Sequence, residues 1–256
     1  EFAEVYLNGK YHGLYCLTEK MDRKQLKLKK FDEATETSPE VIRGTLYKSS
    51  QWSYEVLMGH EMGVNYFPKL APESYDNKKR SETWANFEIK YPDWEEEPID
   101  WGPLWNAINF VATTGDVAFN SEVHKYFDIP GVTDYYLFIE LMLATDNHGK
   151  NLFLYNYDQT LDNQNLRQRM GIAPWDLDGV WGRRWDGSSD ICVPDQDFTT
   201  FLWEYEHGTL TLFHRLKRSS YLSWNTELAA RYAELREKRM SELTQQIEDI
   251  QARKKQ

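Results

Sequence analysis

Two polar loops in the sequence carry the residue types of a phosphoryl-transfer site. The first loop, 146–151, follows a long apolar run, and the second, 176–179, follows a short apolar segment that reads as a strand. In phosphoryl-transfer enzymes an Asp accepts or orients the attacking hydroxyl, and an Asn five positions later holds Mg²⁺. A later Asp, carried on the end of a strand, bridges the metal to the nucleotide phosphates. The spacing of Asp146, Asn151 and Asp176 predicts this chemistry.

Three more side chains in these loops could support the same reaction. His148 is a candidate to contact a phosphate or a loop carbonyl, and Lys150 is a candidate to neutralise the transferring phosphoryl group. Asp178 follows Asp176 by two positions, so both carboxylates could contact one cation if the strand continues. Oxygen ligands of this kind suit Mg²⁺ or Mn²⁺. A structural role, in which these residues cap turns and satisfy backbone groups, stays open.

A phosphoryl-transfer site also needs a cation on the nucleotide phosphates. Lys48, which ends the expected strand 44–48, is the first candidate, and Lys90 is its rival. Glu19 is the candidate ion-pair partner for whichever of these two lysines is buried. The segment 8–15 could cover the phosphates as a reduced glycine-rich loop.

Composition indicates a folded chain with an acidic surface. The 256 residues can bury a substantial core in one domain or two lobes, and an aromatic content of 15% argues against disorder. The 30 basic and 41 acidic residues give a net charge of −11, which disfavours nucleic acid and anionic membranes as partners. The chain has no apolar run long enough for a membrane span. Cys16 and Cys192 lack a zinc-binding spacing, and we expect two buried free thiols.

Residues 1–92 are predicted to form a small, mostly antiparallel β lobe. Alternating apolar residues predict a hairpin of strands 2–7 and 12–18 around an Asn-Gly turn. The other expected elements of this lobe are two strands, one short helix and one loop, at 44–48, 84–91, 54–62 and 67–80 respectively.

Residues 93–256 are predicted to form a mainly helical lobe, after an acidic hinge bracketed by prolines at 92–98. Beyond the hinge the hydrophobic period changes from two residues to about 3.6. The expected helices are one that begins near Asp100 and buries Leu104, Ile108 and Val111, then 120–126, 131–143, 198–205, 209–218 and 225–253.

The last of these helices is long and amphipathic. We expect Asn225 to cap its N-terminus and Glu227 to lie in its first turn. Its apolar stripe is expected to pack back on its own lobe rather than on a partner helix, and consists of Leu228, Tyr232, Leu235, Leu243, Ile247 and Ile250.

Taken in order, these motifs resemble those of the CotH family, atypical protein kinases first associated with bacterial spore coats. The matching segments cover roughly residues 1–185 and lie at 6–15, 17–22, 46–48, 146–155 and 174–178. The Pro-Trp-Asp-x-Asp block and the Asp-x4-Asn-x3-Tyr block are specific together, whereas the hairpin alone is not. The family has further strands before this region, so we expect the N-terminal lobe in this sequence to be incomplete.

The resemblance implies an α+β, protein-kinase-like fold with a β-rich N-terminal lobe and a mainly helical C-terminal lobe. It implies a kinase that uses ATP and Mg²⁺ to phosphorylate Ser or Thr in a secreted, coat or surface protein. Asp146 would be the catalytic-loop Asp, Asn151 and Asp176 metal ligands, and Asp178 a further ligand or a structural partner. The adenine would lie near the hinge at 88–93. An extracellular, cell-surface or periplasmic location follows from the same resemblance.

Two departures from ordinary kinases accompany the match. Ala144-Thr145 precedes Asp146 where His-Arg is usual, and Leu177-Asp178 follows Asp176 where Phe-Gly is usual. Two other functions therefore stay open. One is a pseudokinase that binds a nucleotide or a partner without transfer. The other is a carbohydrate-active hydrolase, because paired carboxylates in an acidic, Trp-rich chain also fit that chemistry.

Overall fold

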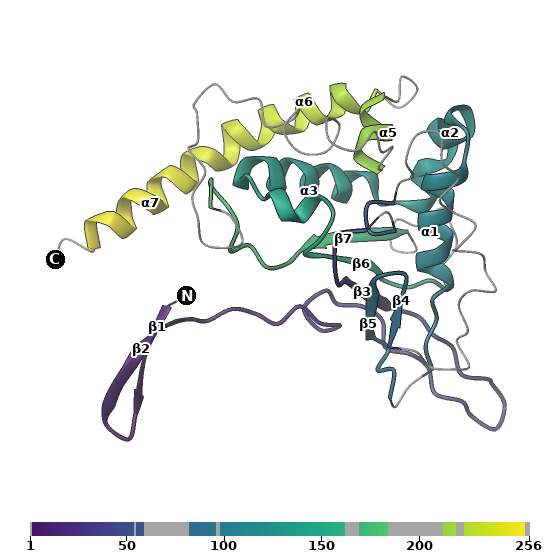
Figure 1. The fold of residues 1–256 in the computed structure, drawn as a ribbon, viewed down its shortest axis with the longest axis horizontal. Helices are drawn as coiled ribbons and strands as arrows, with labels where there is room; N and C mark the ends of the chain where they lie inside the picture. Colours follow the sequence, from purple (N-terminus) through teal and green to yellow (C-terminus); the bar gives the residue numbers. More distant parts are fainter. Residues whose placement is uncertain are drawn as a thin grey trace.

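The centre of the fold is an antiparallel sheet of five strands in the order β4-β5-β3-β6-β7 (Figure 1). This computed structural model describes residues 2–53, 55–58, 82–95, 98–161, 169–183, 212–218 and 223–253. The strands of the sheet are β3 Thr45–Ser49, β4 Thr83–Trp84, β5 Phe87–Tyr91, β6 Leu152–Asn156 and β7 Met170–Pro174. With helices packed beside this sheet, the predicted α+β class is confirmed. Two predicted segments lie outside the described residues, the helix at 198–205 and the loop at 67–80. Of the helix predicted at 54–62, the structure describes only residues 55–58.

The sheet joins strands from both sides of the predicted boundary at residue 92. β3 pairs with β5 on one side and with β6 on the other, so both parts of the chain share one hydrogen-bonded sheet. The strand predicted at 84–91 is instead a hairpin, since Ala85 and Asn86 adopt positive φ angles of 52° and 61° between β4 and β5. Two such residues make the tight turn that suits antiparallel strands. The division into two kinase lobes stays a prediction.

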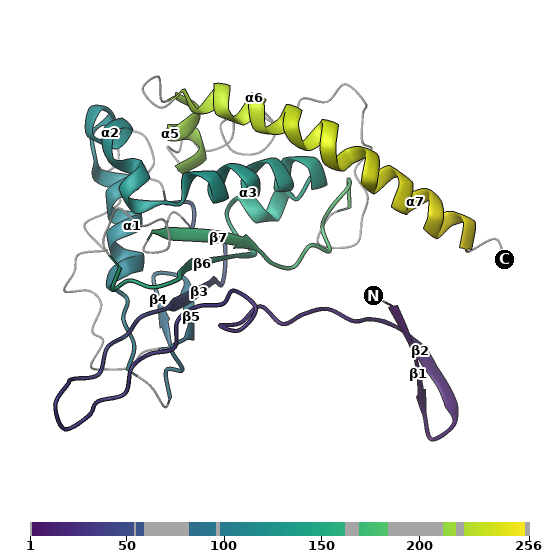
Figure 2. The ribbon, with the colours of Figure 1, turned by 180° about the vertical axis from the view of Figure 1, so that it is seen from behind.

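The predicted N-terminal hairpin is present, but it forms a two-stranded sheet of its own. Its strands are β1 Phe2–Leu7 and β2 Lys10–Cys16, joined by the expected Asn-Gly turn. Figures 1 and 2 show it projecting away from the five-stranded sheet. Because Cys16 lies on this hairpin, it is an exposed free thiol rather than a buried one. Cys192 lies outside the described residues.

Three helices supply the main core against one face of the sheet. They are α1 Gly102–Thr113, α2 Asp116–Tyr126 and α3 Ile129–Met142, close to the predicted ranges except that α2 begins earlier. Alternation along the strands decides which side chains join them. The face toward the helices carries Tyr47, Ile89, Leu154 and Ile172, packed with the predicted Leu104, Ile108 and Val111.

The opposite face of the sheet is covered by the segment that leads from the hairpin to β3. Leu28 of that segment is buried in a smaller cluster with Leu46, Tyr91, Phe153 and Ala173. This cluster covers only part of the face. The end of the face near Trp175, whose side chain is 36% exposed, remains open to solvent.

The long tail helix is confirmed over two α-helices joined by a π-helical turn. α6 Trp224–Leu235 continues through Arg236–Met240 into α7 Ser241–Arg253, after the separate helix α5 Leu212–Arg218. The N-cap prediction is wrong, because Ser223 holds that position. The Asn225 side chain instead donates to the carbonyl of Lys217 at 2.9 Å.

Only the first half of this tail packs back on the core. In α6, Trp224 is buried and its Nε1 donates to Thr133 Oγ1 of α3 at 2.9 Å. In α7, Leu243, Ile247 and Ile250 are 41%, 43% and 54% exposed, and the helix extends away from the sheet in Figure 1. The expectation that the whole stripe packs on its own lobe is therefore wrong for α7, and also for Tyr232 of α6, which is 52% exposed.

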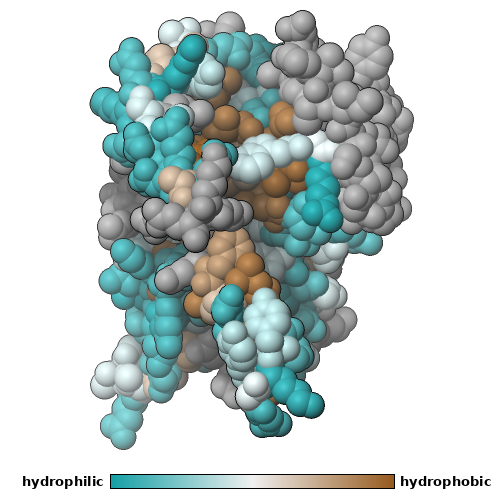
Figure 3. Space-filling model, turned by 90° about the vertical axis from the view of Figure 1, so that its left-hand side faces the viewer, coloured by the Kyte–Doolittle hydropathy of each residue, from teal (hydrophilic) through white to brown (hydrophobic). Residues whose placement is uncertain are grey.

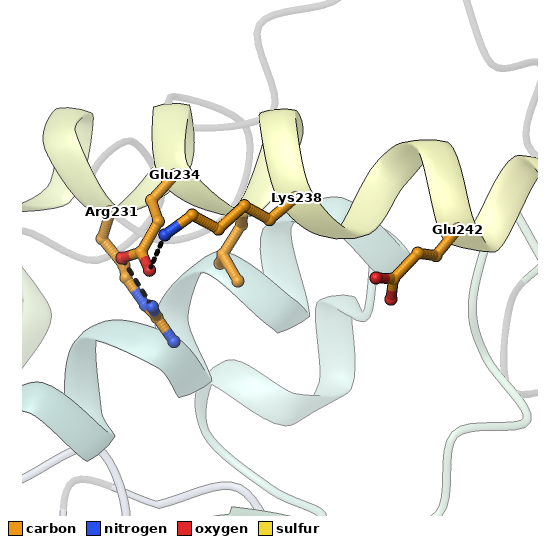
Figure 4. A pocket seen from close by; sticks show the side chains of 5 residues that line it. Arg231, Glu234, Lys238 and Glu242 are labelled. Atoms are coloured by element: carbon orange, nitrogen blue, oxygen red, sulfur yellow. Dashed lines mark hydrogen bonds and ion pairs between the residues drawn. The ribbon is translucent and has the colours of Figure 1, made fainter.

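A charged network fastens α6 to α3. Arg231 donates to both carboxylate oxygens of Asp134 at 2.6 and 2.9 Å, and also to Glu234 at 2.8 Å. Figure 4 shows Glu234 between Arg231 and Lys238 along a surface cavity of about 520 Å³. The hydrogen bonds from Arg231 and Lys238 lower the pKa of Glu234. Since these groups are largely exposed and already paired, the network holds two helices together rather than forming a site.

A second ion pair is buried at the far end of β6. Arg43 Nη2 donates to Asp158 Oδ2 at 2.5 Å, and Thr160 Oγ1 donates to Asp158 Oδ1 at 2.6 Å. The Asp158 side chain is only 1% exposed. Burial alone would raise the pKa of Asp158, but the hydrogen bonds from Arg43 and Thr160 outweigh it and lower that pKa.

We expect Asp158→Asn to lower the free energy of unfolding by about 3 kcal/mol at neutral pH, because Arg43 loses its buried partner. A carboxylate with a depressed pKa stabilises the fold above its unfolded pKa, and that stabilisation is lost as pH falls through the folded-state value. In urea unfolding, the gap between variant and parent should therefore shrink as pH falls below 3.8, the ordinary pKa of an aspartate. Glu33→Gln is the control, because its pair with Lys30 is exposed. A gap that stays constant in acid would contradict the prediction.

Candidate active site

The first polar loop forms a 3-10 turn, Thr145–His148, between α3 and β6. α3 ends at Leu143, which adopts a left-handed conformation with φ of 53° and turns the chain out of the helix. The carbonyl of Asp146 then accepts a hydrogen bond from the backbone N–H of Lys150 at 2.8 Å. This turn brings the chain back to the sheet, so that Asn151 immediately precedes β6.

The second polar loop lies directly against the end of the first. The backbone N–H of Trp175 donates to the carbonyl of Asn151 at 2.8 Å, which continues the β6–β7 pairing one step beyond the strands. Asn151 Nδ2 in turn lies 3.5 Å from the carbonyl oxygen of Asp176. The structure therefore brings together Asn151 and Asp176, as the sequence predicted.

Both of these residues hold an unusual backbone conformation. Asn151 has φ of 53° and Asp176 has φ of 55°, in the left-handed region that favours glycine. Such a conformation costs roughly 1–2 kcal/mol per residue, although Asn and Asp tolerate it better than most side chains. Strain of this kind gathers at functional sites, where the surrounding structure imposes it. The two candidate metal ligands are thus held in place by their neighbours.

Asn147, to which the sequence analysis gave no role, links the two loops. Its side chain is buried at 1% exposure, and its Nδ2 donates to the carbonyls of Asn151 at 2.7 Å and Trp175 at 2.8 Å. Its own carbonyl accepts from the hydroxyl of Tyr135 at 2.6 Å. Burial raises the pKa of Tyr135 far above its ordinary value, so this hydroxyl remains a donor. In the sequence, Asn147 is one more polar residue in a polar loop.

The oxygen donors at this junction fit Mg²⁺. Among the described residues, no three His, Cys, Asp or Glu side chains gather closely enough to hold a metal by themselves. Mg²⁺ does not need such a cluster, because it commonly takes one or two protein ligands and completes its shell with phosphate oxygens and water. With its Nδ2 directed at the Asp176 carbonyl, Asn151 can offer Oδ1, and Asp176 offers an exposed carboxylate. Asp178 is also exposed, two residues further along.

The structure brings Lys48, and not Lys90, to these loops. Lys48 Nζ lies 5.7 Å from the ring centroid of Trp175, the residue before Asp176. Lys90 Nζ instead pairs with Glu88 at 2.7 Å and Glu82 at 3.8 Å. Lys48 is thus the candidate lysine that lies beside the residue preceding Asp176, and contact of either lysine with a phosphate stays a prediction.

The predicted partner Glu19 is not brought to either lysine. Glu19 is exposed and lies just after β2, on the segment that leaves the separate hairpin. In the part of the chain that the structure describes, the acidic partners of Lys90 are Glu88 and Glu82. The ion pair between Glu19 and a buried lysine has no support in this arrangement.

His148 and Lys150 take different places around the first loop. His148 is turned toward α3, where its Nε2 lies 3.0 Å from Glu140 Oε1 and its ring packs edge-on against Tyr136 and Phe213. This places His148 among the helices, away from the Asn151–Asp176 junction. Lys150 is half-buried, with its backbone N–H held by Asp146. Contact of either side chain with phosphate stays a prediction.

A second residue that the sequence analysis missed contacts Asp146. Trp52, which follows β3, donates from Nε1 to Asp146 Oδ1 at 3.2 Å. β3 therefore places Lys48 beside Trp175, and the segment that follows β3 places an indole at Asp146. No short-range pattern marks Trp52 in the sequence, because its partner lies 94 residues away.

These loops lie at the end of the sheet that is open to solvent. In Figure 1 the chain that follows β7 runs along the left end of α3, and Trp181 N donates to the carbonyl of Met142 there at 2.8 Å. Figure 3 turns this side of the molecule to the viewer and shows hydrophobic side chains in a hollow bordered by hydrophilic ones.

Asp146, Asn151 and Asp176 have the residue types and the order expected of a site of the protein-kinase-like class, and the structure places Asn151 beside Asp176. The family model described as CotH kinase protein matches residues 1–255. The chain therefore belongs to the CotH kinase family. This membership supports a protein-kinase-like function, with the general use of ATP and a divalent metal that such kinases share. No curated protein matches the chain. Within the described residues, no helix combines the length and apolar character needed to cross a membrane.

Proposed function

We propose that the protein is a protein kinase that transfers the γ-phosphoryl group of ATP to Ser or Thr hydroxyls of a secreted, coat or surface protein. The observation that carries this proposal is the junction built by Asn147, which holds Asn151 beside Asp176. A hydrolase that uses two carboxylates has no need of a buried Asn that orients a second Asn. Membership of the CotH kinase family supports the same function.

Each candidate residue in and around this junction has a role in the proposed reaction. Asp146 orients the acceptor hydroxyl and accepts its proton, while Lys48 offsets the negative charge of the phosphates. Asn151 and Asp176 would hold Mg²⁺, which when bound supplies positive charge to the phosphate oxygens. The hydroxyl oxygen bonds to the γ-phosphorus as the bond from that phosphorus to ADP breaks, and ADP leaves with the electron pair.

The direct test is transfer of label from ATP to an acidic acceptor such as casein. With the full chain and Mg²⁺, label from the γ position is expected on protein, and label from the α position is not. Protein labelled from the α position would instead identify nucleotidyl transfer. If ATP and Mg²⁺ raise the unfolding midpoint but no label moves, the protein is a pseudokinase.

The two candidate lysines give a matched pair of variants. We expect Lys48→Ala to lower kcat/KM for ATP by about tenfold or more, because a charge-assisted contact to phosphate is lost. Lys90→Ala should stay within about twofold of the parent, because the ammonium group of Lys90 is paired with Glu88 and Glu82 at the surface of β5. The measurement is initial transfer rate against ATP concentration. A larger loss in Lys90→Ala would assign the phosphate contact to the other lysine.

A further inference from the structure

Trp52 contacts the first polar loop in two independent ways. Its indole Nε1 donates to Asp146 Oδ1 at 3.2 Å. Its ring also lies directly against Gly149, three residues later in the same loop. A Cβ atom at Gly149 would lie 2.1 Å from Trp52 Cζ3 and 2.2 Å from Cε3, closer than any real contact. The indole therefore lies on the backbone of the loop while its N–H contacts the carboxylate.

The glycine at this position is explained by the indole. Gly149 has a negative φ of −141°, outside the left-handed region that favours glycine. The Trp52 ring, together with Leu57 Cδ2 at 2.6 Å from the same hypothetical Cβ, leaves no room for a side chain there. Trp52 and Gly149 are thus a matched pair, and the sequence of the loop is adapted to an indole from β3.

The two residues at the end of β3, just before Trp52, are hydrogen-bonded to two different neighbouring segments. Ser49 Oγ donates to the Leu152 carbonyl at 3.1 Å and accepts from the Leu152 N–H at 3.1 Å, next to Asn151. Ser50 donates from its N–H and its hydroxyl to the Asn86 carbonyl, at 2.9 and 2.8 Å. These bonds fix the exit of β3 against β6 and against the β4–β5 turn. Trp52 is therefore presented to Asp146 by an anchored segment.

We propose that Trp52 is a positioning residue that fixes the carboxylate of Asp146 for phosphoryl transfer. Its N–H occupies Oδ1, so Oδ2 is the oxygen directed to the acceptor hydroxyl. The proposal rests on the proposed kinase function, in which Asp146 contacts the substrate. It also connects β3 to both halves of the site, because Lys48 and Trp52 lie on the same short stretch of chain.

The first test separates the N–H donor from the aromatic ring. Trp52→Phe keeps an aromatic ring against Gly149 but removes the donor to Asp146. We expect kcat to fall about tenfold or more, because hydrogen bonds to charged groups are among the stronger ones, while KM for ATP stays within about twofold. Trp105→Phe on α1, a half-buried tryptophan outside the site, should leave both constants within about twofold of the parent. An unchanged kcat in Trp52→Phe would overturn the proposal.

The second test does not depend on enzymatic activity. In ¹⁵N-labelled full-length protein, the Trp52 indole N–H resonance is identified by its loss in Trp52→Phe. Asp146→Ala is expected to shift that resonance and to speed its exchange with water, while the Trp105 indole resonance stays in place. If the shift occurs in a protein that transfers no phosphate, the contact is real and the kinase function fails. If the Trp52 indole resonance is unchanged in Asp146→Ala, the hydrogen bond from Trp52 to Asp146 is overturned.

Discussion

Asn147→Leu is expected to reduce phosphoryl transfer by about 100-fold or more, because misplacement of reacting groups by about 1 Å can cost that much. The side chain has nearly the same size, so the change removes hydrogen bonds rather than volume. The carbonyls of Asn151 and Trp175 each lose the donor Nδ2, although the Asn151 carbonyl keeps the backbone N–H of Trp175. We expect the free energy of unfolding to fall by about 1–3 kcal/mol, the usual cost of weakened hydrogen bonding at buried or partly buried acceptors.

The comparison with other variants tests the mechanism of this loss. Asn147→Asp should be worse than Asn147→Leu, because a carboxylate would face two carbonyl oxygens in a buried place. Asn225→Leu is the control, since it removes one exposed bond from an Asn side chain to a backbone carbonyl. Its effect on unfolding is expected below about 1 kcal/mol, with transfer unchanged. Urea unfolding and label transfer measure both effects. A phosphoryl-transfer rate in Asn147→Leu within tenfold of the parent rate would show that the site does not need the hydrogen bonds of Asn147.

Residue types and spacing were sufficient to name the candidate groups of the site. Asp146, Asn151 and Asp176 were identified because polar residues between apolar runs are placed by the elements on either side. The residues that hold those groups could not be found in the same way. Asn147 donates a hydrogen bond to a carbonyl 28 residues away, and Trp52 donates one to a carboxylate 94 residues away. Both contacts depend on strand pairing that no local sequence pattern reveals.

The choice between the two lysines shows the same limit. Lys48 ends its predicted strand and was the first candidate, but the sequence left Lys90, next to the end of another predicted strand, as a rival. The strand order decides, because β3 lies next to β6 and so brings Lys48 toward Trp175, whereas β5 lies one strand further away. Strand order depends on long-range pairing, which periodicity does not show.

The helices illustrate what periodicity does determine. The stripe of α1 predicted its buried residues Leu104, Ile108 and Val111, because a period of 3.6 describes one face of a helix. The equally regular stripe of α7 is exposed. A stripe shows which face of a helix is apolar, but what covers that face depends on where the rest of the chain lies.

Asp176→Ala is expected to abolish the Mg²⁺-dependent stabilisation of the protein by ATP. A ligand at 100 times its Kd stabilises the folded state by about 2.7 kcal/mol, which corresponds to a midpoint rise of roughly 5–10 °C for a chain of this size. With Asp176 absent, the predicted metal ligands that remain are Asn151 and Asp178. ATP with EDTA in place of Mg²⁺ should then give the same small shift in variant and parent.

Asp178→Ala is the matched variant, since it removes an equally exposed carboxylate two residues away. Only Asp176 has its backbone bound by Asn151, and only Asp176 in this pair adopts a positive φ. We therefore expect Asp178→Ala to keep most of the rise in unfolding midpoint that ATP and Mg²⁺ produce. The unfolding midpoints measured without ligand should show that both variants fold. If Asp178→Ala loses the Mg²⁺ dependence and Asp176→Ala keeps it, the metal is held two residues further along the loop. In that case the strained backbone at Asp176 serves to turn the chain and not to present a ligand.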